Sequence, residues 1–492
     1  MSLKVCRAAV VAALLIGASF VVPALEAQDQ PAPVQLGPVN FTGSIRDRIE
    51  DWNWFTPSTG NPKYTLDDAT IRLGISGKGS LFDWMVEIET PVLLNLPTSA
   101  VAPGAQGQLG LGATYYVANG KERNAAMVFP KQVYLRFHNV LGDAGSLQLG
   151  RFEFFDGLEV KSTDPTIAAL KRDRIQQRLI GTFAFTDVLR AFDGIHYAYD
   201  TPSTNFTLVG AVPTRGVFQV DGWGWNDVVF AYGSATRQLH TVSTTGEVRL
   251  FAIYYDDFRP VAKVDNRPTA VKAADHADVS IWTVGGHYVD ALKTGAGIFD
   301  VLGEGAYQFG NWGAEQQRAY MVDLEAGYQP KILGRLTPWI QGGYYYGSGD
   351  KHPNDNIHGT FFQLMPTTRQ YARFPFFNMM NNVDRFGILT LHPHKRFTVH
   401  TEAHSLRLAT GADLWYSGGG VFSPWSFGYQ GRAGNGSTSL ANLYDVNVDI
   451  TINSHLSVSP YYGYAQGKSV IQSIYPKGKD GVLAFLETNF RF

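Results

Sequence analysis

The sequence has 492 residues, a formal net charge of −2 and a single cysteine. This charge balance gives no indication of nucleic-acid binding, and the sequence has no long uninterrupted apolar segment that could form a transmembrane helix. It is instead rich in aromatic residues and glycine, with 24 Tyr, 31 Phe, 10 Trp and 52 Gly, a composition that suits a β-barrel in a membrane. Cys6 precedes the first apolar run, so we expect a mature chain without disulfides or thiol chemistry.

The N-terminus predicts a signal peptide over residues 1–27. Lys4 and Arg7 precede an apolar stretch from Ala8 to Val22, and small residues around Ala27 suit cleavage after that position. We therefore expect export through the inner membrane. A short periplasmic segment over residues 28–40 would follow, and then a barrel over residues 41–492.

Alternating apolar and polar side chains predict β-strands along most of the chain. Residues 444–453 alternate Tyr, Val and Ile with Asp, Asn and Thr, and segments 69–76, 82–89 and 320–329 keep their charged residues on one face. Water must then contact one face and an apolar medium the other. A closed transmembrane antiparallel up-and-down β-barrel satisfies both conditions, because all backbone polar groups pair between strands. The chain length predicts about 18 strands, with roughly 16 to 20 acceptable.

Several stretches interrupt this pattern and are predicted to be long loops. They are rich in Pro, Gly or Ala and cover about residues 91–125, 156–190, 211–227 and 347–387. The second contains a predicted short helix between Asp164 and Gly181, in which Asp164 caps the N-terminus and Pro165 takes the first helical position.

The last strand, from Gly481 to Phe492, places Leu486, Phe490 and Phe492 on one face and Glu487 on the other. It resembles the C-terminal signal by which outer-membrane barrels are recognised for assembly. We therefore expect the barrel-assembly machinery to recognise the strand that ends at Phe492. Outer-membrane lipid and lipopolysaccharide would surround the finished barrel.

Several long sequence strings resemble the alginate-export family of outer-membrane porins. They lie at residues 150–157, 170–181, 213–219, 371–378 and 413–416, and the similarity extends from about residue 40 to the end of the chain. The resemblance implies a monomeric barrel of about 18 strands. It also implies an electropositive constriction that passes an acidic polysaccharide.

Basic residues on the polar strand faces and in two loops are candidates for the substrate path. Guanidinium groups form bidentate hydrogen bonds with carboxylates and stay charged at any relevant pH, so a ring of them would concentrate anions. The candidates are Arg46, Arg48, Arg72, Arg136, Arg151, Lys171, Arg172, Arg174, Arg178, Arg369 and Arg373, with Tyr371 beside the last two.

A structural role for these cations is the alternative, because large barrels also pair lumen arginines with acids to stiffen the interior. Glu87, Glu89, Asp323 and Glu325 are available as partners. For the cations between Lys171 and Arg178 we favour a functional role, because Asp173 is the one acid among them and cannot pair with all four.

Enzymatic and metal sites have weak support in the sequence. His400, Glu402 and His404 project to one face of a strand and could share a metal, but the spacing fixes no third histidine, so we predict no metal and no cofactor. Ser405 and His404 are adjacent in a strand and point to opposite faces, which excludes a direct hydrolase pair.

We therefore predict that the chain is an outer-membrane channel of a diderm bacterium rather than an enzyme. It would pass anionic solutes, in particular acidic polysaccharide or oligosaccharide, through an arginine-lined constriction. A general diffusion porin for small anions or sugars and a non-conducting structural barrel or adhesin remain alternatives. Anionic carbohydrate is the expected partner, nucleic acid is not, and we expect a monomer.

Overall fold

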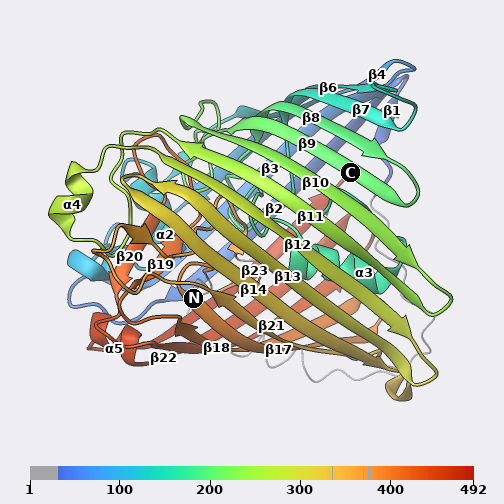
Figure 1. Ribbon diagram of the computed structural model, residues 1–492. Helices are drawn as coiled ribbons and strands as arrows, with labels where there is room; N and C mark the ends of the chain where they lie inside the picture. The colour runs from blue at the N-terminus through green and yellow to red at the C-terminus, as the bar shows by residue number, and fades with distance from the viewer. Residues whose placement is uncertain (1–30, 335, 369–370, 375–377) are drawn as a thin grey trace.

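A computed structural model describes residues 31–334, 336–368, 371–374 and 378–492. The predicted signal peptide and Arg369 lie outside the described residues. The remaining chain forms a closed antiparallel barrel of eighteen strands, which confirms the predicted fold class and strand number. The barrel closes where the first and last of these strands pair, with Arg48 opposite Glu487. Figure 1 shows the strands running obliquely along the barrel wall.

The barrel strands follow chain order around the wall. They are β2 (Val39–Asn53), β3 (Lys63–Lys78), β4 (Phe82–Leu94), β6 (Phe129–His138), β7 (Gly145–Phe152), β8 (Phe192–Asp200), β9 (Thr204–Pro213), β10 (Val228–His240), β11 (Thr244–Asp257), β12 (Val279–Lys293), β13 (Gly297–Trp312), β14 (Glu315–Pro330), β15 (Trp339–Gly347), β17 (Asn382–His394), β18 (Phe397–Leu408), β21 (Ser439–Thr451), β22 (Leu456–Gly467) and β23 (Asp480–Arg491).

The other elements are not among these eighteen barrel strands. Short strands are β1 (Val34–Leu36), β5 (Ala125–Ala126) and β16 (Ile357–His358), and β19 (Leu414–Gly418) pairs with β20 (Tyr429–Ala433) in a separate hairpin. The helical segments are η1 (Gly104–Gln106), α2 (Leu111–Ala118), α3 (Pro165–Leu170), η2 (Lys171–Ile175), α4 (Thr269–Ala274), η3 (Lys331–Leu333) and α5 (Ser469–Ile474). None of the helices among the described residues is long and apolar enough to span a membrane.

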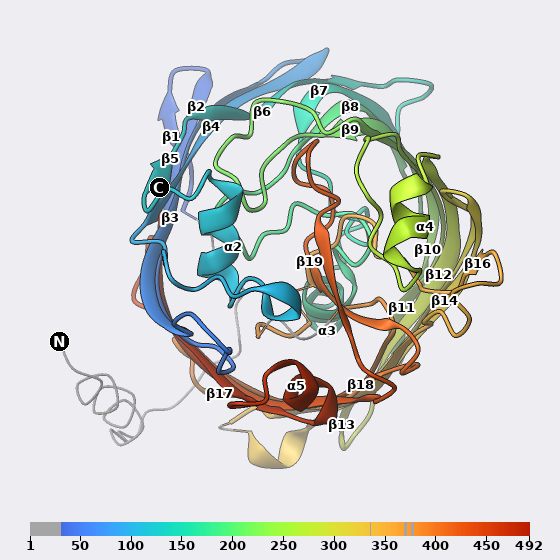
Figure 2. The same cartoon turned by 90° about the vertical axis from the view of Figure 1, so that its left-hand side faces the viewer.

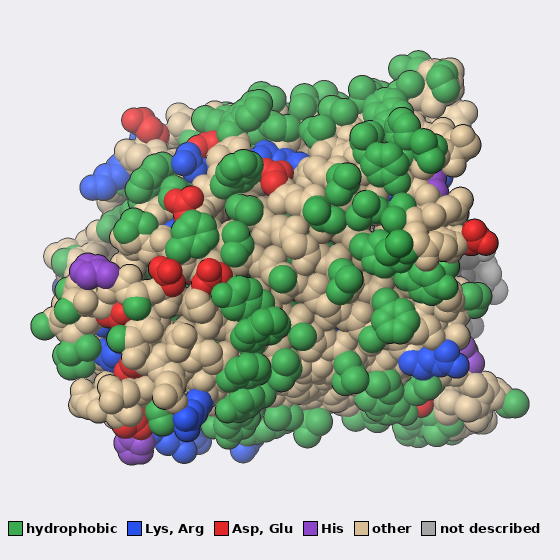
Figure 3. Space-filling model, turned by 45° about the horizontal axis from the view of Figure 1, so that its top comes forward, with side chains coloured by type: hydrophobic (Ala, Val, Ile, Leu, Met, Phe, Trp, Pro, Cys, Tyr) green, Lys and Arg blue, Asp and Glu red, His purple; other side chains and the backbone are tan. Residues whose placement is uncertain are grey.

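The alternating pattern divides the wall into an apolar outer face and a polar inner face. On β14, Tyr320 and Leu324 are exposed, whereas Asp323 and Glu325, one position away, are buried inside the barrel. Figure 3 shows hydrophobic side chains over much of the middle of the outer face and charged side chains toward its two ends. This arrangement is the one that a bilayer requires of a barrel.

The two ends of the barrel differ in the length of their connections. Short turns such as 79–81 and 241–243 close one end, where β2 starts and β23 finishes. The other end carries the long connections, including residues 95–128, 153–191, 214–227, 258–278, 348–381 and 409–438. Figure 2 looks in from this end and shows α2, α3 and β19 inside the ring of strands.

The predicted bounds of three loops include residues that belong to barrel strands. The residues concerned, 91–94, 211–213 and 382–387, continue β4, β9 and β17. Pro91 still pairs with Thr70 of the neighbouring strand. Proline lacks the N–H donor, yet a strand tolerates it where that donor is not needed, so a proline-rich stretch does not always end a strand. The long connections at 258–278 and 409–438 were not predicted.

Side chains of the inward-folded connections build an apolar core inside the barrel. Phe183, Phe218, Phe362, Met365 and Tyr416 are all buried there and come from four different connections. The interior is therefore a packed layer of loops against the wall.

Candidate functional site

Residues 153–191, here called the inner loop, lie inside the barrel and begin with the predicted helix. The Asp164 carboxylate accepts hydrogen bonds from the backbone N–H groups of Thr166 (3.0 Å) and Ile167 (3.2 Å), and Pro165 stands at the first helical position. This confirms the predicted cap. The helical conformation passes from α3 into the wider turn of η2 and ends at Ile175, so the helix is shorter than predicted.

Cations of the inner loop pair with acids of the barrel wall. Lys171 lies 2.7 Å from Glu247 of β11, and Arg174 lies 2.9 Å from Glu325 of β14. Arg178 lies 2.6 Å from Asp323 and 3.3 Å from Glu304; Arg172, which is exposed, pairs with Asp173. Asp173 pairs with Arg172 alone, as the sequence analysis expected of this single local acid, and wall strands distant in sequence supply carboxylates to the other three cations.

The inner loop is also tied to the wall through its acids. Asp187 lies 2.9 Å from Arg46, and Glu159 lies 2.9 Å from Arg249 of β11. Burial raises the pKa of Asp187, but Arg46 and Arg48 outweigh it and bring that pKa to about 2. These contacts hold the loop against strands on different sides of the lumen.

Three more predicted path residues on the wall strands form ion pairs. Arg48 lies 2.8 Å from Glu487 and thereby connects the first and last barrel strands. Arg72 contacts Glu89 and Glu153, and Arg151 contacts Asp193. Carboxylates thus accompany most of the predicted cations.

Arg136 differs from these residues. Its guanidinium donates to the Oε1 atom of Gln148 at 3.1 and 2.8 Å, and no carboxylate of the described chain lies within ion-pair distance. Leu135 is exposed on the outer face, so Arg136 points into the lumen. Asp83 is its partner in the register of β4 and β6, but the two side chains form no ion pair.

Two of the predicted path residues, Tyr371 and Arg373, lie in the 348–381 connection. The Tyr371 hydroxyl donates to the backbone oxygens of Ile175 (3.1 Å) and Gln176 (2.9 Å), and its ring lies 4.5 Å from the Arg178 guanidinium. Arg373 lies 5.5 Å from the ring of Tyr461. Tyr371 therefore fastens this connection to the inner loop.

The predicted weak metal candidates on β18, His400, Glu402 and His404, contact acidic and polar side chains. The His404 ring lies between Asp384, 2.7 Å from Nδ1, and Glu402, 3.2 Å from Nε2. His400 contacts Thr390 at 3.0 Å and Asp449 at 3.6 Å. Within residues that the structure describes, no three His, Cys, Asp or Glu side chains are grouped to hold a metal ion.

Two buried arginines that the sequence analysis missed have neutral partners. Arg190 of the inner loop donates to the backbone oxygen of Gly419, and burial lowers its pKa to about 10. Arg432 of β20 donates to the backbone oxygen of Ala105 (2.9 Å), to Ser417 (2.8 Å) and to Gln430 (2.9 Å). Neither has an acid within ion-pair distance in the described ranges. One sequence signal was available, because residues 414–433 contain no Asp or Glu.

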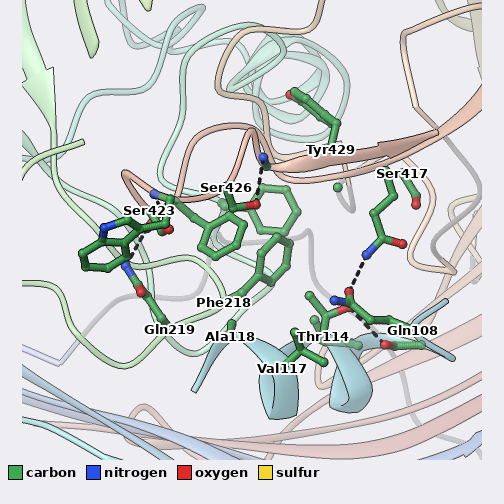
Figure 4. Close-up of a pocket in the computed structure, with 18 of the residues that line it drawn as sticks. Gln108, Thr114, Val117, Ala118, Phe218, Gln219, Ser417, Ser423, Ser426 and Tyr429 are labelled. Atoms are coloured by element: carbon green, nitrogen blue, oxygen red, sulfur yellow. Dashed lines mark hydrogen bonds between the residues drawn. The ribbon is translucent and has the colours of Figure 1, made fainter. Parts of the chain in front are cut away.

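Arg432 also lines two adjoining cavities at the long-loop end. One cavity, of about 320 Å³, lies between α2, the β19–β20 hairpin and Phe218 (Figure 4). The other, of about 580 Å³, extends toward Lys263 and Lys272 of the 258–278 connection. The barrel mouth therefore holds a cationic recess.

The sequence of this chain is similar to that of a known protein family. A sequence model of the family described as alginate export matches residues 131–466, well over half of the chain. A search of the curated proteins finds no match.

Solved structures with a similar fold are outer-membrane proteins. The outer membrane protein OpdK of Pseudomonas aeruginosa is 10% identical, with a TM-score of 0.52 over 92% of this chain and 99% of that chain. OccK2 (OpdF) of the same organism, solved in complex with glucuronate, is 7% identical, with a TM-score of 0.56 over 92% and 98%. OccAB4 of Acinetobacter baumannii is 8% identical, with a TM-score of 0.54 over 95% and 100%. At such low identity the likeness shows the fold.

The chain forms an eighteen-stranded barrel with an apolar outer face and with loops folded into a charged lumen, and the family model matches most of its length. The chain therefore belongs to the alginate export family of outer-membrane channels.

Proposed function

We propose that this channel conducts anionic solutes, and acidic oligosaccharide or polysaccharide in particular. The observation that carries the proposal is the set of interior arginines without a carboxylate partner. Arg136 lies near the short-turn end of β6, Arg190 on the inner loop and Arg432 on the hairpin at the opposite mouth. Fixed positive charge in a narrow aqueous path attracts anions and repels cations.

The relatives support an acidic sugar as the solute. The family is described as alginate export, and alginate is a polymer of uronic acids. One similar barrel was solved with glucuronate, a single acidic sugar. Arginine binds such carboxylates through two parallel N–H donors.

The inner loop is the proposed constriction, although most of its cations contribute by holding it in place. Lys171, Arg174 and Arg178 are neutralised by wall acids. Arg172 is 62% exposed and remains accessible to a passing solute. Selectivity would therefore depend on Arg172 and on the three arginines with neutral partners more than on the buried pairs.

A planar-bilayer recording of the refolded protein under a salt gradient tests this proposal. We expect a reversal potential of the sign for anion selectivity, and block by an oligouronate. Arg136→Gln should reduce the anion preference severalfold. Arg237→Gln is the matched control, because Arg237 is exposed beside the 201–203 turn and bonds Ser203 and Thr204.

Two outcomes would contradict the proposal, and a third would contradict the role of Arg136 in it. A weakly selective current that oligouronate does not block would favour a general porin. The absence of any current would favour a structural barrel or adhesin. Equal selectivity in Arg136→Gln and the wild type would remove Arg136 from the path.

A further inference from the structure

The two cavities at the long-loop mouth adjoin each other and are together called the mouth cleft here. They share the lining residues Gln108, Val117, Gln430 and Arg432. Their volumes, about 320 and 580 Å³, are each within the size of ligand sites, which is roughly 300–1,000 Å³. The cleft is built from connections far apart in sequence, so no single segment reveals it.

The larger part of the mouth cleft is positively charged. Lys121, Lys263, Lys272 and Arg432 line it, and no described Asp or Glu does so. Lys121 is exposed and has no described carboxylate partner, and Lys272 donates to the backbone oxygen of Asp265 at 2.9 Å. Lys263 does meet an acid, Asp275, at 3.4 Å, but Asp275 is shared with Arg267. Positive charge therefore exceeds negative charge around this part of the cleft, which suits an anion.

The smaller part of the cleft offers aromatic faces beside polar groups. Trp54, Phe183, Phe218, Phe422, Trp425 and Tyr429 contribute rings to its lining. Trp425 is 72% exposed, although a large aromatic side chain is normally covered. Figure 4 shows Phe218 between α2 and the segment that carries Ser423 and Ser426. Flat apolar faces of this kind accept the C–H faces of sugar rings.

Polar groups around these rings still have donors to offer. The hydroxyl of Ser417 accepts a hydrogen bond from Arg432, that of Ser423 from the backbone N–H of Trp425, and that of Ser426 from the backbone N–H of Gly428. None of the three donates to another residue of the described chain, and the Gln108 amide nitrogen likewise has no described acceptor. A ligand rich in oxygen would satisfy these donors.

We propose that the mouth cleft binds a segment of an acidic oligosaccharide, with its carboxylates at Lys121, Lys272 and Arg432 and its sugar faces against Phe218 and Trp425. The proposal deepens the proposed function and rests on it, because it assigns the solute a binding site at the barrel mouth. A chain of several sugars would reach from the charged part into the aromatic part. A single small anion would fill the charged part alone.

Binding of a uronate tetramer and of a neutral tetrasaccharide to the full barrel in detergent tests this proposal by calorimetry. The wild type should bind the acidic tetramer at least tenfold more tightly. The double variant Lys121→Gln/Lys272→Gln should weaken acidic binding at least fivefold and leave neutral binding unchanged. Trp425→Ala should weaken both. Lys351→Gln is the control, since this exposed lysine of the same end lines neither cavity.

The variants are compared only after heat-dependent gel mobility shows a folded barrel. Unchanged affinity for the acidic tetramer in both cleft variants would overturn the mouth cleft. A wild-type channel without anion selectivity would instead overturn the proposed function, and the bilayer recording detects that independently.

Discussion

The inner loop and the hairpin at the mouth use buried arginines in opposite ways. On the inner loop, Arg174 and Arg178 form ion pairs with wall carboxylates at 2.9 and 2.6 Å. These pairs neutralise the two arginines and hold the loop against the wall. On the hairpin, Arg432 is equally buried but is held by a backbone oxygen, a serine and a glutamine. The difference teaches that the number of arginines in a lumen says little about selectivity, whereas the nature of their partners says much.

The largest effect should come from breaking a pair on the inner loop. Arg178→Met leaves Asp323 and Glu304 buried without their cation, and the free energy of unfolding should fall by about 3–5 kcal/mol. Urea unfolding in detergent, followed by tryptophan fluorescence, measures this. Arg172→Met, at the exposed pair, should change it by less than about 1 kcal/mol. Equal losses in the two variants would contradict a structural role for Arg178, and adding Asp323→Asn to Arg178→Met should restore part of the loss.

A smaller effect concerns the pH dependence of the inner loop. Burial raises the pKa of Asp156 to about 7, and Arg249 only partly opposes this. An unfolded aspartate has a pKa near 3.9, so between about pH 4 and 7 the folded chain keeps a proton that the unfolded chain has lost. Stability should therefore fall as pH rises through this window.

Asp156→Asn cannot ionise and should remove this component. Its free energy of unfolding should fall by about 2–3 kcal/mol less than that of the wild type between pH 5 and pH 8. Asp173→Asn, which removes an exposed carboxyl of the same loop, is the control. Parallel pH curves for Asp156→Asn and the wild type would show that Asp156 is ionised in the folded state throughout.

The smallest effect should appear at the hairpin, where binding rather than stability is at stake. Gly428 has a φ of +94°, and a Cβ there would overlap the backbone oxygen of Gly420. Gly428→Ala should therefore displace β20 with Arg432 and weaken oligouronate binding about tenfold. Gly436→Ala is the matched control, because Gly436 has a φ of +81° but open space around its Cβ position. Similar binding in the two variants would separate the hairpin from the binding site.

The wall and the interior differ in how well the sequence predicts them. The alternation from Tyr320 to Tyr328, and Leu486 and Phe490 opposite Glu487, identified inner and outer faces correctly because a strand has a fixed period of two. The partners of Arg174 and Arg178 could not be found this way, since they depend on which strand faces the loop across the lumen. The hairpin over 414–433 has neither alternation nor charge pairs, so no local rule reveals that it turns inward.

Some expectations stay predictions. Recognition of the strand ending at Phe492 by the assembly machinery, a monomeric state and the identity of the acidic sugar are among them. The signal peptide and the place of Arg369 in the substrate path also stay predictions, because these residues lie outside the described ones.

The ion pair between Arg48 and Glu487 has a consequence for how the barrel is made. It joins residues 439 positions apart, across the seam between β2 and β23. Contacts of such sequence separation are slow to form, because the entropy lost on closing the long intervening loop precedes the stabilisation that the contact gives. Until β23 arrives, β2 keeps an open edge that could pair with another chain. Seam closure is thus expected to be a late step, and a chain truncated before β23 should aggregate rather than form a smaller pore.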